Sequence, residues 1–371
     1  MQTRAAVMNA PGDVAVRTLD VPADDADLMI DVTDCGICGT DVHMYDGELD
    51  IDFPVIPGHE FVGVVTSRSD DGVTDARGRS VHESDPVTVV PGVSCGECWY
   101  CEQVRARPTT CVDRMRYGFT NVDQPPFVGG LSQRLPVCPG SRFYRLPDSL
   151  DPGLGLLAEP LSVATHALER AESPDVSWAK EGLDLGQTVA VHGVGPIGLL
   201  CVFTAAVHGA GRVVAIDLDK ARLELAQAFG ATDIVAAAGL STDAVVRKVE
   251  SVTDSGVGPD VVVETAGVPA TLKQDLRMVR RGGTIVDLGT LGGETVDLDY
   301  PQIVRKQLDV RGSYAYPPSQ FETALSLLDD YADDYPFADL LSVHVDLDDI
   351  ETAYDAQASG DALRAVVHPN R

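Results

Sequence analysis

The chain has 371 residues, enough for two or three domains with ordinary hydrophobic cores. Its 44% of hydrophobic and 23% of charged residues exclude a disordered, collagenous or coiled-coil chain. Acidic residues outnumber basic ones by 57 to 28, which gives a formal net charge of −29, and only five of the basic residues are lysines. Such a negative surface disfavours nucleic acids and anionic membranes as partners. We expect a protein from a high-salt cytoplasm, that of a halophile, where salt screens the repulsion between carboxylates.

Residues 1–11 lack the apolar centre of a cleaved secretion signal and predict a short strand instead. No run of about 18 apolar residues that could span a bilayer occurs in the sequence. We therefore expect a cytoplasmic protein with no membrane partner. In a reducing compartment, clustered cysteines are more often metal ligands or reactive groups than disulfides.

The first part of the chain, up to about residue 150, has short β-branched stretches separated by Gly, Pro and Asp, which predict an irregular β domain. After residue 151 the pattern changes: residues 156–171 have helical spacing, and from residue 188 strands alternate with helices. The predicted strands are residues 188–192, 212–217, 233–235, 260–265, 283–288 and 310–313. The predicted helices between them are residues 197–208, 220–229, 243–251, 269–279 and 301–306.

Short apolar strands joined by crossover helices predict a parallel sheet covered on both faces, so the expected fold class is α/β with a doubly wound domain. Beyond residue 317 we expect helices at residues 320–330 and 348–358 and a last strand at residues 362–367. The acidic runs 24–27, 329–334 and 346–351 lack the spacing of a calcium loop and predict solvated surface.

A glycine-rich turn follows the first predicted strand of the parallel sheet. Gly193, Gly195 and Gly198 stand in G-x-G-x-x-G order, with Pro196 and Ile197 at the start of the next helix. The first glycine permits a tight turn, the second lets the backbone approach a pyrophosphate, and the third lets the helix pack on the strand. Unpaired N–H groups at the helix start would face the phosphates. In this strand–turn–helix context the motif predicts a dinucleotide site.

The end of the next predicted strand favours NAD as the dinucleotide. Asp217 stands nineteen residues after the last glycine of the motif. A carboxylate there can accept hydrogen bonds from the adenosine ribose and would repel the 2′-phosphate of NADP. Lys220 and Arg222 lie close enough in the sequence to admit some use of NADP.

Four cysteines form a compact group: Cys95, Cys98 and Cys101 at intervals of three, then Cys111 after nine intervening residues. Four thiolates from one short segment can surround a tetrahedral Zn²⁺ ion and leave no open position, which makes such a site structural. The alternative is a set of unmetallated thiols on a loop. The remaining cysteines, Cys35, Cys138 and Cys201, are expected to be packing residues, and His166, His192 and His208 to be core or helix-face residues.

A third group is dispersed along the chain. Cys38 lies in Gly-Ile-Cys-Gly-Thr-Asp-Val-His, His59 in Gly-His-Glu, and Glu159 in Ala-Glu-Pro. A cysteine, a histidine and a carboxylate would bind zinc with a vacancy for water or substrate, as catalytic zinc sites do. Taken singly, each residue is ambiguous, because a lone cysteine or histidine is more often a packing or surface residue than a metal ligand.

Together these motifs, in this order, resemble the zinc-dependent medium-chain dehydrogenases, the superfamily of alcohol, polyol, threonine and glucose dehydrogenases. The resemblance covers essentially the whole chain. It implies a GroES-like β catalytic domain at residues 1–169 and 313–371, a Rossmann domain at residues 170–312, and an active site in the cleft between them. The family members are usually dimers or tetramers, so a homodimer or homotetramer is expected.

The resemblance also assigns roles to residues. The first metal ligand falls on Cys38 and the second on His59, while Glu60 and Glu159 occupy carboxylate positions that bind the metal directly, through water, or in alternation. Thr40 and His43 match the proton-relay positions, although His43 could instead be a surface histidine near the ribose. The spacing from Cys101 to Cys111 is two residues longer than the commonest family pattern, which loop slack tolerates.

Two departures pull the sequence towards the polyol and sugar branch. Animal-type alcohol dehydrogenases often have a cysteine where Glu159 stands and a basic residue where Gly39 stands. The expected reaction is reversible oxidation of a secondary alcohol, with zinc as Lewis acid and hydride transfer to NAD⁺. A polyol or sugar is the expected substrate, and a threonine-type amino alcohol is the alternative; residues 115–127 and the Tyr144 segment resemble inosose- and polyol-oxidising members.

Two other classes remain as alternatives. A zinc-free quinone or enoyl reductase of the same superfamily would lack the set of Cys38, His59 and Glu159. A redox- or zinc-sensing module would bind cofactor or metal without turnover. The sequence does not specify which alcohol is oxidised, how strictly NAD is preferred, or which carboxylate binds the catalytic zinc at rest.

Overall fold

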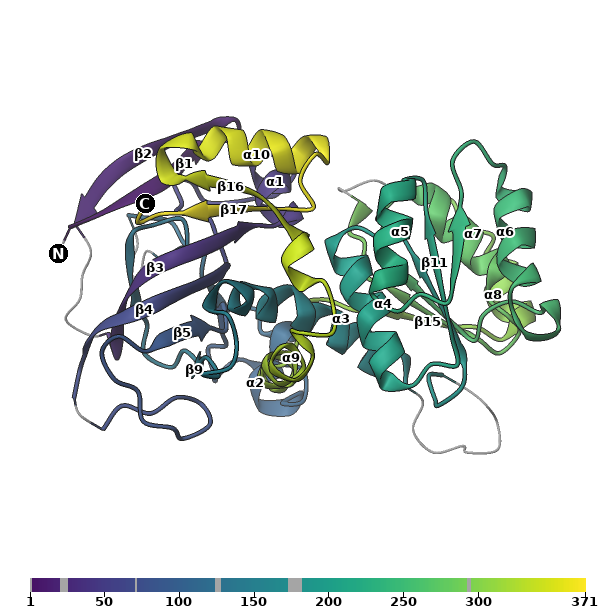
Figure 1. Cartoon of the computed structure of the whole chain (residues 1–371), viewed down its shortest axis with the longest axis horizontal. Coiled ribbons are helices and arrows are strands. Elements are labelled where there is room, and N and C mark those ends of the chain that lie inside the picture. The colour runs from purple at the N-terminus through teal and green to yellow at the C-terminus, as the bar shows by residue number, and fades with distance from the viewer. Residues whose placement is uncertain (1, 21–25, 71, 124–127, 173–181, 292–294) are drawn as a thin grey trace. The chain divides into compact units, whose positions relative to one another are not determined.

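The computed structural model describes residues 2–20, 26–70, 72–123, 128–172, 182–291 and 295–371. The chain forms two compact units (Figure 1): unit 1 comprises Met1–Glu159 with Pro317–Arg371, and unit 2 comprises Pro160–Tyr316. The sequence-based division at 169/170 and 312/313 differs from this one. In the structure the first boundary follows Glu159, near the start of helix α3 (Ala158–Ala171), and the second follows Tyr316. Residues 24 and 25 of the first acidic run, and residues 124–127, lie outside the described part.

Unit 1 is built on a sheet with the strand order β16-β17-β3-β4-β5-β9, and β8 also pairs with β3. All its pairings are antiparallel except that of β16 with β17. Its strands are β3 (Leu28–Ile37), β4 (Glu60–Arg68), β5 (Pro86–Val89), β8 (Arg134–Val137), β9 (Phe143–Arg145), β16 (Leu341–Asp346) and β17 (Arg364–His368). Two further ribbons pair β1 (Gln2–Ala10) with β2 (Asp13–Asp20) and β6 (Gly92–Val93) with β7 (Met115–Arg116).

Short helices cover and connect these strands. They are α1 (Gly39–Tyr45), α2 (Trp99–Gln103), α9 (Pro318–Tyr331) and α10 (Ile350–Ser359), with the 3-10 turns η1 (Pro108–Thr110), η2 (Pro152–Leu157), η5 (Phe337–Leu340) and η6 (Leu347–Asp349). The core includes Leu28, Ile30 and Val32 of β3, each fully buried. The register of β3 against β4 shifts between Val32 and Asp34, and the strand then ends at Ile37, directly before Cys38. A long central strand thus fixes the backbone at the first candidate metal ligand.

Unit 2 has a six-stranded parallel sheet in the order β12-β11-β10-β13-β14-β15. Its strands are β10 (Thr188–His192), β11 (Arg212–Asp217), β12 (Asp233–Ala236), β13 (Val261–Glu264), β14 (Thr284–Asp287) and β15 (Asp309–Gly312). The helices are α3, α4 (Pro196–His208), α5 (Lys220–Ala228), α6 (Thr242–Ser251), α7 (Pro269–Met278) and α8 (Tyr300–Lys306), with the 3-10 turn η3 (Asp254–Gly256). The order reverses between β10 and β13, the place where doubly wound sheets bind dinucleotides.

The expected α/β class and doubly wound sheet are confirmed, and the elements of the sheet begin and end within one residue of the expected bounds. One strand, β16, was not expected; its side chains alternate between partly buried and exposed. The acids of the run 346–351 are exposed, as expected, with Asp348 paired to Arg4 at the surface, while Leu347 and Ile350 between them are buried. Within the described residues, none of the helices has both the length and the apolar character needed to cross a membrane.

Candidate functional site

Three chemically different side chains converge at the end of β3 and the start of β4. The thiol of Cys38, the imidazole of His59 and the carboxylate of Glu60 each place one ligand atom within 4.8 Å of the other two. Cys38 is half-buried at the N-terminus of α1, and His59 and Glu60 are buried. Sulfur, nitrogen and oxygen donors in this number suit zinc and leave a fourth coordination position.

Asp41 organises two of these ligands and was missed in the sequence. Its fully buried carboxylate accepts hydrogen bonds from the backbone N–H of Cys38 (2.8 Å) and of Gly58 (3.3 Å). Its Oδ1 also lies 3.6 Å from Nδ1 of His59, beyond hydrogen-bond distance, and this buried nitrogen has no hydrogen-bond partner within the described residues. Burial lowers the pKa of His59, but the charge of Asp41 and the contact with Cys38 outweigh it and raise that pKa. An acid three residues after a helix cap was the available signal.

Glu60 is held by a buried arginine that the sequence analysis also missed. Nη1 of Arg364, on β17, donates to Oε1 of Glu60 at 2.7 Å and to the carbonyl of Ile37 at 3.3 Å, and both side chains are at most 2% exposed. Oε2 of Glu60 has no hydrogen-bond partner within the described residues. A Cβ on Gly36 would lie 2.7 Å from that oxygen, so a larger residue there would have to displace the carboxylate of Glu60. A buried carboxylate whose one oxygen is paired with an arginine can bind a metal cation with its other, unpaired oxygen.

Glu159, the other carboxylate candidate, stands apart from this group. It is in the first turn of α3, and it is not among the three residues whose ligand atoms converge. Its charge acts on Arg364, whose pKa is lowered by burial but raised more strongly by Glu60 and Cys38, with Glu159 adding to the rise. The carboxylate that the structure brings to Cys38 and His59 is therefore Glu60.

Thr40 and His43 both lie on α1. The thiol of Cys38 is 3.7 Å from Oγ1 of Thr40, so this hydroxyl is next to the candidate metal position. His43 is 40% exposed, and its Nδ1 lies 2.5 Å from Oε2 of Glu48. The ring of Phe119 lies next to that of His59, with the two centroids 5.4 Å apart. The structure places Thr40 beside the ligands and His43 towards the surface.

The four clustered cysteines form a second group. The Sγ–Sγ distances are 3.5 Å for Cys98–Cys101 and Cys95–Cys111, 3.9 Å for Cys98–Cys111 and 4.0 Å for Cys95–Cys101. Sulfurs that surround one tetrahedral Zn²⁺ lie about 3.8 Å apart, so the arrangement fits the ion and none of the pairs is a disulfide. Backbone N–H groups of Cys101 and Val112 lower the pKa of Cys98 to about 6, whereas burial raises the pKa of Cys101 to about 12.

The glycine-rich turn of unit 2 joins β10 to α4. Gly193 has a φ of 90°, the left-handed region that favours glycine, and a Cβ on Gly198 would lie 1.9 Å from the carbonyl oxygen of Gly193. Gly195 is the N-cap of α4, Pro196 and Ile197 follow it, and no described atom lies within 4 Å of its Cβ position. The turn is therefore tight and closely packed, yet open at the helix N-terminus where a phosphate would bind.

Asp217 ends β11 beside this turn. Its Oδ2 accepts the backbone N–H of Val194 at 2.7 Å and its Oδ1 that of Asp219 at 2.9 Å. These bonds hold the carboxylate against the glycine-rich turn, and each oxygen keeps further acceptor capacity. Arg222 follows on α5, where its backbone N–H donates to the capping side chain of Asp219 at 3.3 Å. Cys35, Cys138 and Cys201 are buried, as expected for packing residues.

A Rossmann-type sheet in one unit, with a four-cysteine group and a Cys/His/Glu group in the other, defines the class of zinc-binding dehydrogenases. Comparison with known proteins agrees. Residues 24–148 match the alcohol dehydrogenase GroES-like domain, and residues 196–330 match the zinc-binding dehydrogenase family. The chain belongs to the zinc-dependent medium-chain dehydrogenase family, with a GroES-like catalytic unit and a Rossmann unit.

Named relatives fall within the same family. The chain is 32% identical to a sorbitol dehydrogenase of Bacillus subtilis, covering 99% of this chain and 98% of the relative. It is 30% identical to D-xylulose reductase A of Aspergillus niger, covering 92% and 89%. Among solved structures, a zinc-binding dehydrogenase of Sinorhizobium meliloti bound to NADP superimposes with a TM-score of 0.84 at 30% identity, covering 100% of both chains.

Proposed function

We propose that this protein is a zinc-dependent oxidoreductase that transfers a hydride between the CH–OH group of a secondary alcohol, a polyol or sugar, and NAD. The convergence of Cys38, His59 and Glu60 carries the proposal, because a three-ligand set with an open position is the arrangement of catalytic rather than structural zinc. The group of four cysteines would hold a second, structural zinc ion.

When bound, zinc supplies a Lewis acid for the substrate hydroxyl and NAD supplies the hydride acceptor. The residues of the chain bind, orient and move protons. Asp41 lies beside His59, 3.6 Å from its Nδ1, and Arg364 positions Glu60 by donating to its Oε1 at 2.7 Å. Thr40 can accept the proton of a substrate hydroxyl beside Cys38 and pass it on, and His43 would release it to solvent.

The position of Asp217 supports NAD as the coenzyme. A carboxylate held beside the glycine-rich turn can accept hydrogen bonds from ribose hydroxyls and repels a 2′-phosphate. A similar protein binds NADP, so the coenzyme needs a direct test. Replacing the charge in Asp217→Asn should raise kcat/KM for NADP⁺ relative to NAD⁺ by about tenfold or more, whereas a wild type that already prefers NADP⁺ would contradict the assignment.

The substrate class rests on the similar proteins, which are named for sorbitol and xylulose. Glu159, where simple alcohol dehydrogenases of the animal type often have a cysteine, points the same way. A homodimer or homotetramer in the cytoplasm is the assembly and location that we propose on family grounds.

The deciding experiment measures zinc per chain and the reduction of NAD⁺ by a panel of polyols, aldoses and amino alcohols in molar salt. We expect two zinc ions per chain and oxidation of at least one polyol or sugar. Cys38→Ser should lose one zinc and all turnover, while Cys201→Ala, which removes a buried thiol of unit 2, should keep both zinc ions. Zinc-free protein that reduces quinones, or zinc-loaded protein with no turnover on any alcohol, would overturn the proposal.

A further inference from the structure

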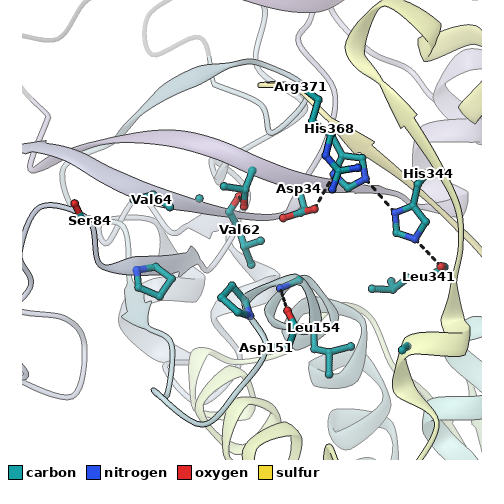
Figure 2. A pocket seen from close by; sticks show the side chains of 16 residues that line it. Asp34, Val62, Val64, Ser84, Asp151, Leu154, Leu341, His344, His368 and Arg371 are labelled. Atoms are coloured by element: carbon teal, nitrogen blue, oxygen red, sulfur yellow. Dashed lines mark hydrogen bonds and ion pairs between the residues drawn. The ribbon is translucent and has the colours of Figure 1, made fainter.

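A chain of polar contacts crosses three neighbouring strands of unit 1 and includes none of the candidate metal ligands. Oδ1 of Asp34 on β3 lies 2.8 Å from Nδ1 of His368 on β17. Nε2 of His368 lies 3.0 Å from Nδ1 of His344 on β16, whose Nε2 lies 2.9 Å from the carbonyl oxygen of Leu341. Figure 2 shows these groups joined one after another by dashed lines, and they line a cavity of about 720 Å³. The proposed dehydrogenase chemistry uses none of them.

The two ends of this chain are acceptors. An ionised aspartate and a backbone carbonyl can only accept, so each outer contact requires a hydrogen on the imidazole nitrogen. The contact between the two rings requires one more hydrogen, because two bare nitrogens facing each other at 3.0 Å repel. The three contacts therefore need three ring protons, whereas two neutral imidazoles carry only two.

A metal ion between the rings does not satisfy this geometry. The rings are within 8° of parallel, and their centroids are 5.2 Å apart, about the 3.0 Å nitrogen–nitrogen distance plus one ring radius at each end. The two nitrogens thus lie on the line that joins the rings, and their lone pairs point at each other. Two nitrogens around one tetrahedral zinc would lie about 3.3 Å apart with their lone pairs converging on a point off that line.

We propose that His344 and His368 share one proton beyond those of two neutral imidazoles, so that an imidazole–imidazolium pair, balanced by Asp34, clasps β16 to the sheet in a pH-dependent way. Loss of that proton removes one of the three hydrogen bonds and leaves two facing lone pairs. The clasp spans the place where the β16–β17 register shifts, between Leu341 and Val343. The pairing of β16 therefore weakens as the proton leaves.

The groups around the pair favour the extra charge on balance. His368 has a side-chain exposure of 5% and Asp34 of 18%, so their attraction is little screened by water, whereas His344 is exposed and its side of the pair faces solvent. The other charged side chains that line the cavity are Arg371, which opposes the charge, and Asp151, which caps the backbone N–H of Gly153 at 2.9 Å. On β16, Asp346 is paired in register with His368 and adds a further acid. The β4 and β5 side of the cavity offers Val62, Gly63, Val64, Ser84 and Pro86, none of which titrates.

The test counts ring protons by NMR on protein labelled with ¹⁵N-histidine, at pH 7.5 and in molar salt. We expect three protons over the four ring nitrogens of His344 and His368. Two protons, one on each ring, would overturn the proposal. In Asp34→Asn, which removes the balancing charge, the count should fall to two.

Hydrogen exchange gives a readout that a merely structural contact would not produce. Amides of β16 should exchange about threefold to tenfold faster, the effect of one hydrogen bond, once the pH is raised until the third proton has left. In His344→Gln, which cannot hold the shared proton, this additional step with pH should disappear, while His208→Gln in unit 2 should retain it. A wild type without the step, or a His344→Gln variant that keeps it, would overturn the proposal.

Discussion

The candidate metal group depends on single side chains that hold its ligands from behind. Glu60 is fully buried, and Arg364 forms an ion pair with its Oε1 at 2.7 Å. A buried ion pair adds little net stability over an apolar pair, but removal of one partner leaves an uncompensated charge. The main effect of removing Arg364 should therefore be the destabilisation caused by leaving the carboxylate of Glu60 buried without a cation.

Arg364→Met should lower the free energy of unfolding by about 3–5 kcal/mol, because the carboxylate of Glu60 is then left buried without its cation. Arg364→Lys should recover only part of the loss, since an ammonium cannot reproduce the two directed N–H bonds to Glu60 and Ile37. Denaturant unfolding in constant high salt measures both changes.

A surface pair supplies the matched control. Arg4 pairs with Asp348, and the two side chains are 42% and 67% exposed. Arg4→Met should cost no more than about 1 kcal/mol, the usual range for exposed pairs. If Arg364→Met is as mild as Arg4→Met, the Glu60 carboxylate does not need its buried partner.

At the scale of elements, the sequence determined the Rossmann unit well and the site only in part. Strands β10, β11, β13 and β14 are mostly buried apolar runs, so period and composition locate them, whereas β15, Asp-Val-Arg-Gly, is a mostly exposed strand at the edge of the sheet. β16 was missed because Ser-Val-His-Val-Asp gives a short, half-exposed edge strand that only its pairing with β17 defines. Arg364 was missed because its importance depends on a contact with Glu60, 304 residues away, and long-range contacts do not follow from spacing; Asp41 was missed although its contact with Cys38 is local.

A row of titratable side chains, one histidine and two acids, crosses the sheet of unit 2. The row consists of His192, Glu264 and Asp287, which are aligned in register at the ends of β10, β13 and β14. Asp275 of α7 joins them: it is fully buried, and its Oδ1 lies 2.7 Å from Nδ1 of His192. Burial raises the pKa of Glu264, of Asp275 and, to about 7, of Asp287. Burial lowers the pKa of His192, but Asp275 raises it more.

Stability should therefore fall as the pH rises towards neutrality. An acid with a raised folded-state pKa binds a proton in the folded protein over a range where the unfolded chain has lost it. For Asp287 this stabilisation is fully present below pH 3.8, the ordinary pKa of an aspartate, and is lost as the pH rises through its folded-state pKa of about 7. Asp287→Asn should remove about 2–4 kcal/mol of the decline in unfolding free energy between pH 5 and pH 8.

Denaturant unfolding across that pH range, at fixed salt, measures the decline. Asp309→Asn on β15 is the control, because Asp309 is exposed and is paired with Arg311 at 2.8 Å. It should leave the pH profile unchanged. An Asp287→Asn profile that coincides with the wild type would show that Asp287 is ionised throughout and that its surroundings accommodate the charge.

The cysteine lobe, residues 95–111, is a second element whose stability has an identifiable source. Its described part has no buried residue in either α2 or η1. Little apolar burial is available to fold it, so the metal must supply the stabilisation. Cys98→Ser should lose one zinc ion per chain and make the lobe the first site of cleavage by protease, with zinc at the Cys38 group retained. Retention of two zinc ions would contradict the tetrahedral assignment.

The charge of the whole molecule sets the conditions in which these units fold. The formal net charge of −29 on 371 residues destabilises the folded state, because the acidic side chains repel one another more strongly in the compact protein than in the expanded, unfolded chain. The range of that repulsion is about 10 Å at 0.1 M salt and about 3 Å at 1 M. With only five lysines, exposed basic partners for the carboxylates must be supplied mainly by arginine.

We therefore expect the melting temperature to rise steeply with KCl and the fold to be lost on dialysis into low salt. Sucrose at the same osmolarity strengthens burial but screens no charge, so it should restore much less stability than KCl. The substitutions Asp333→Lys and Asp334→Lys replace two exposed acids of one run and should shift the unfolding midpoint to a lower salt concentration. Equal rescue by sucrose and KCl, or full stability of the wild type in low salt, would show that charge repulsion does not limit the fold and that the acidic surface is no adaptation to salt.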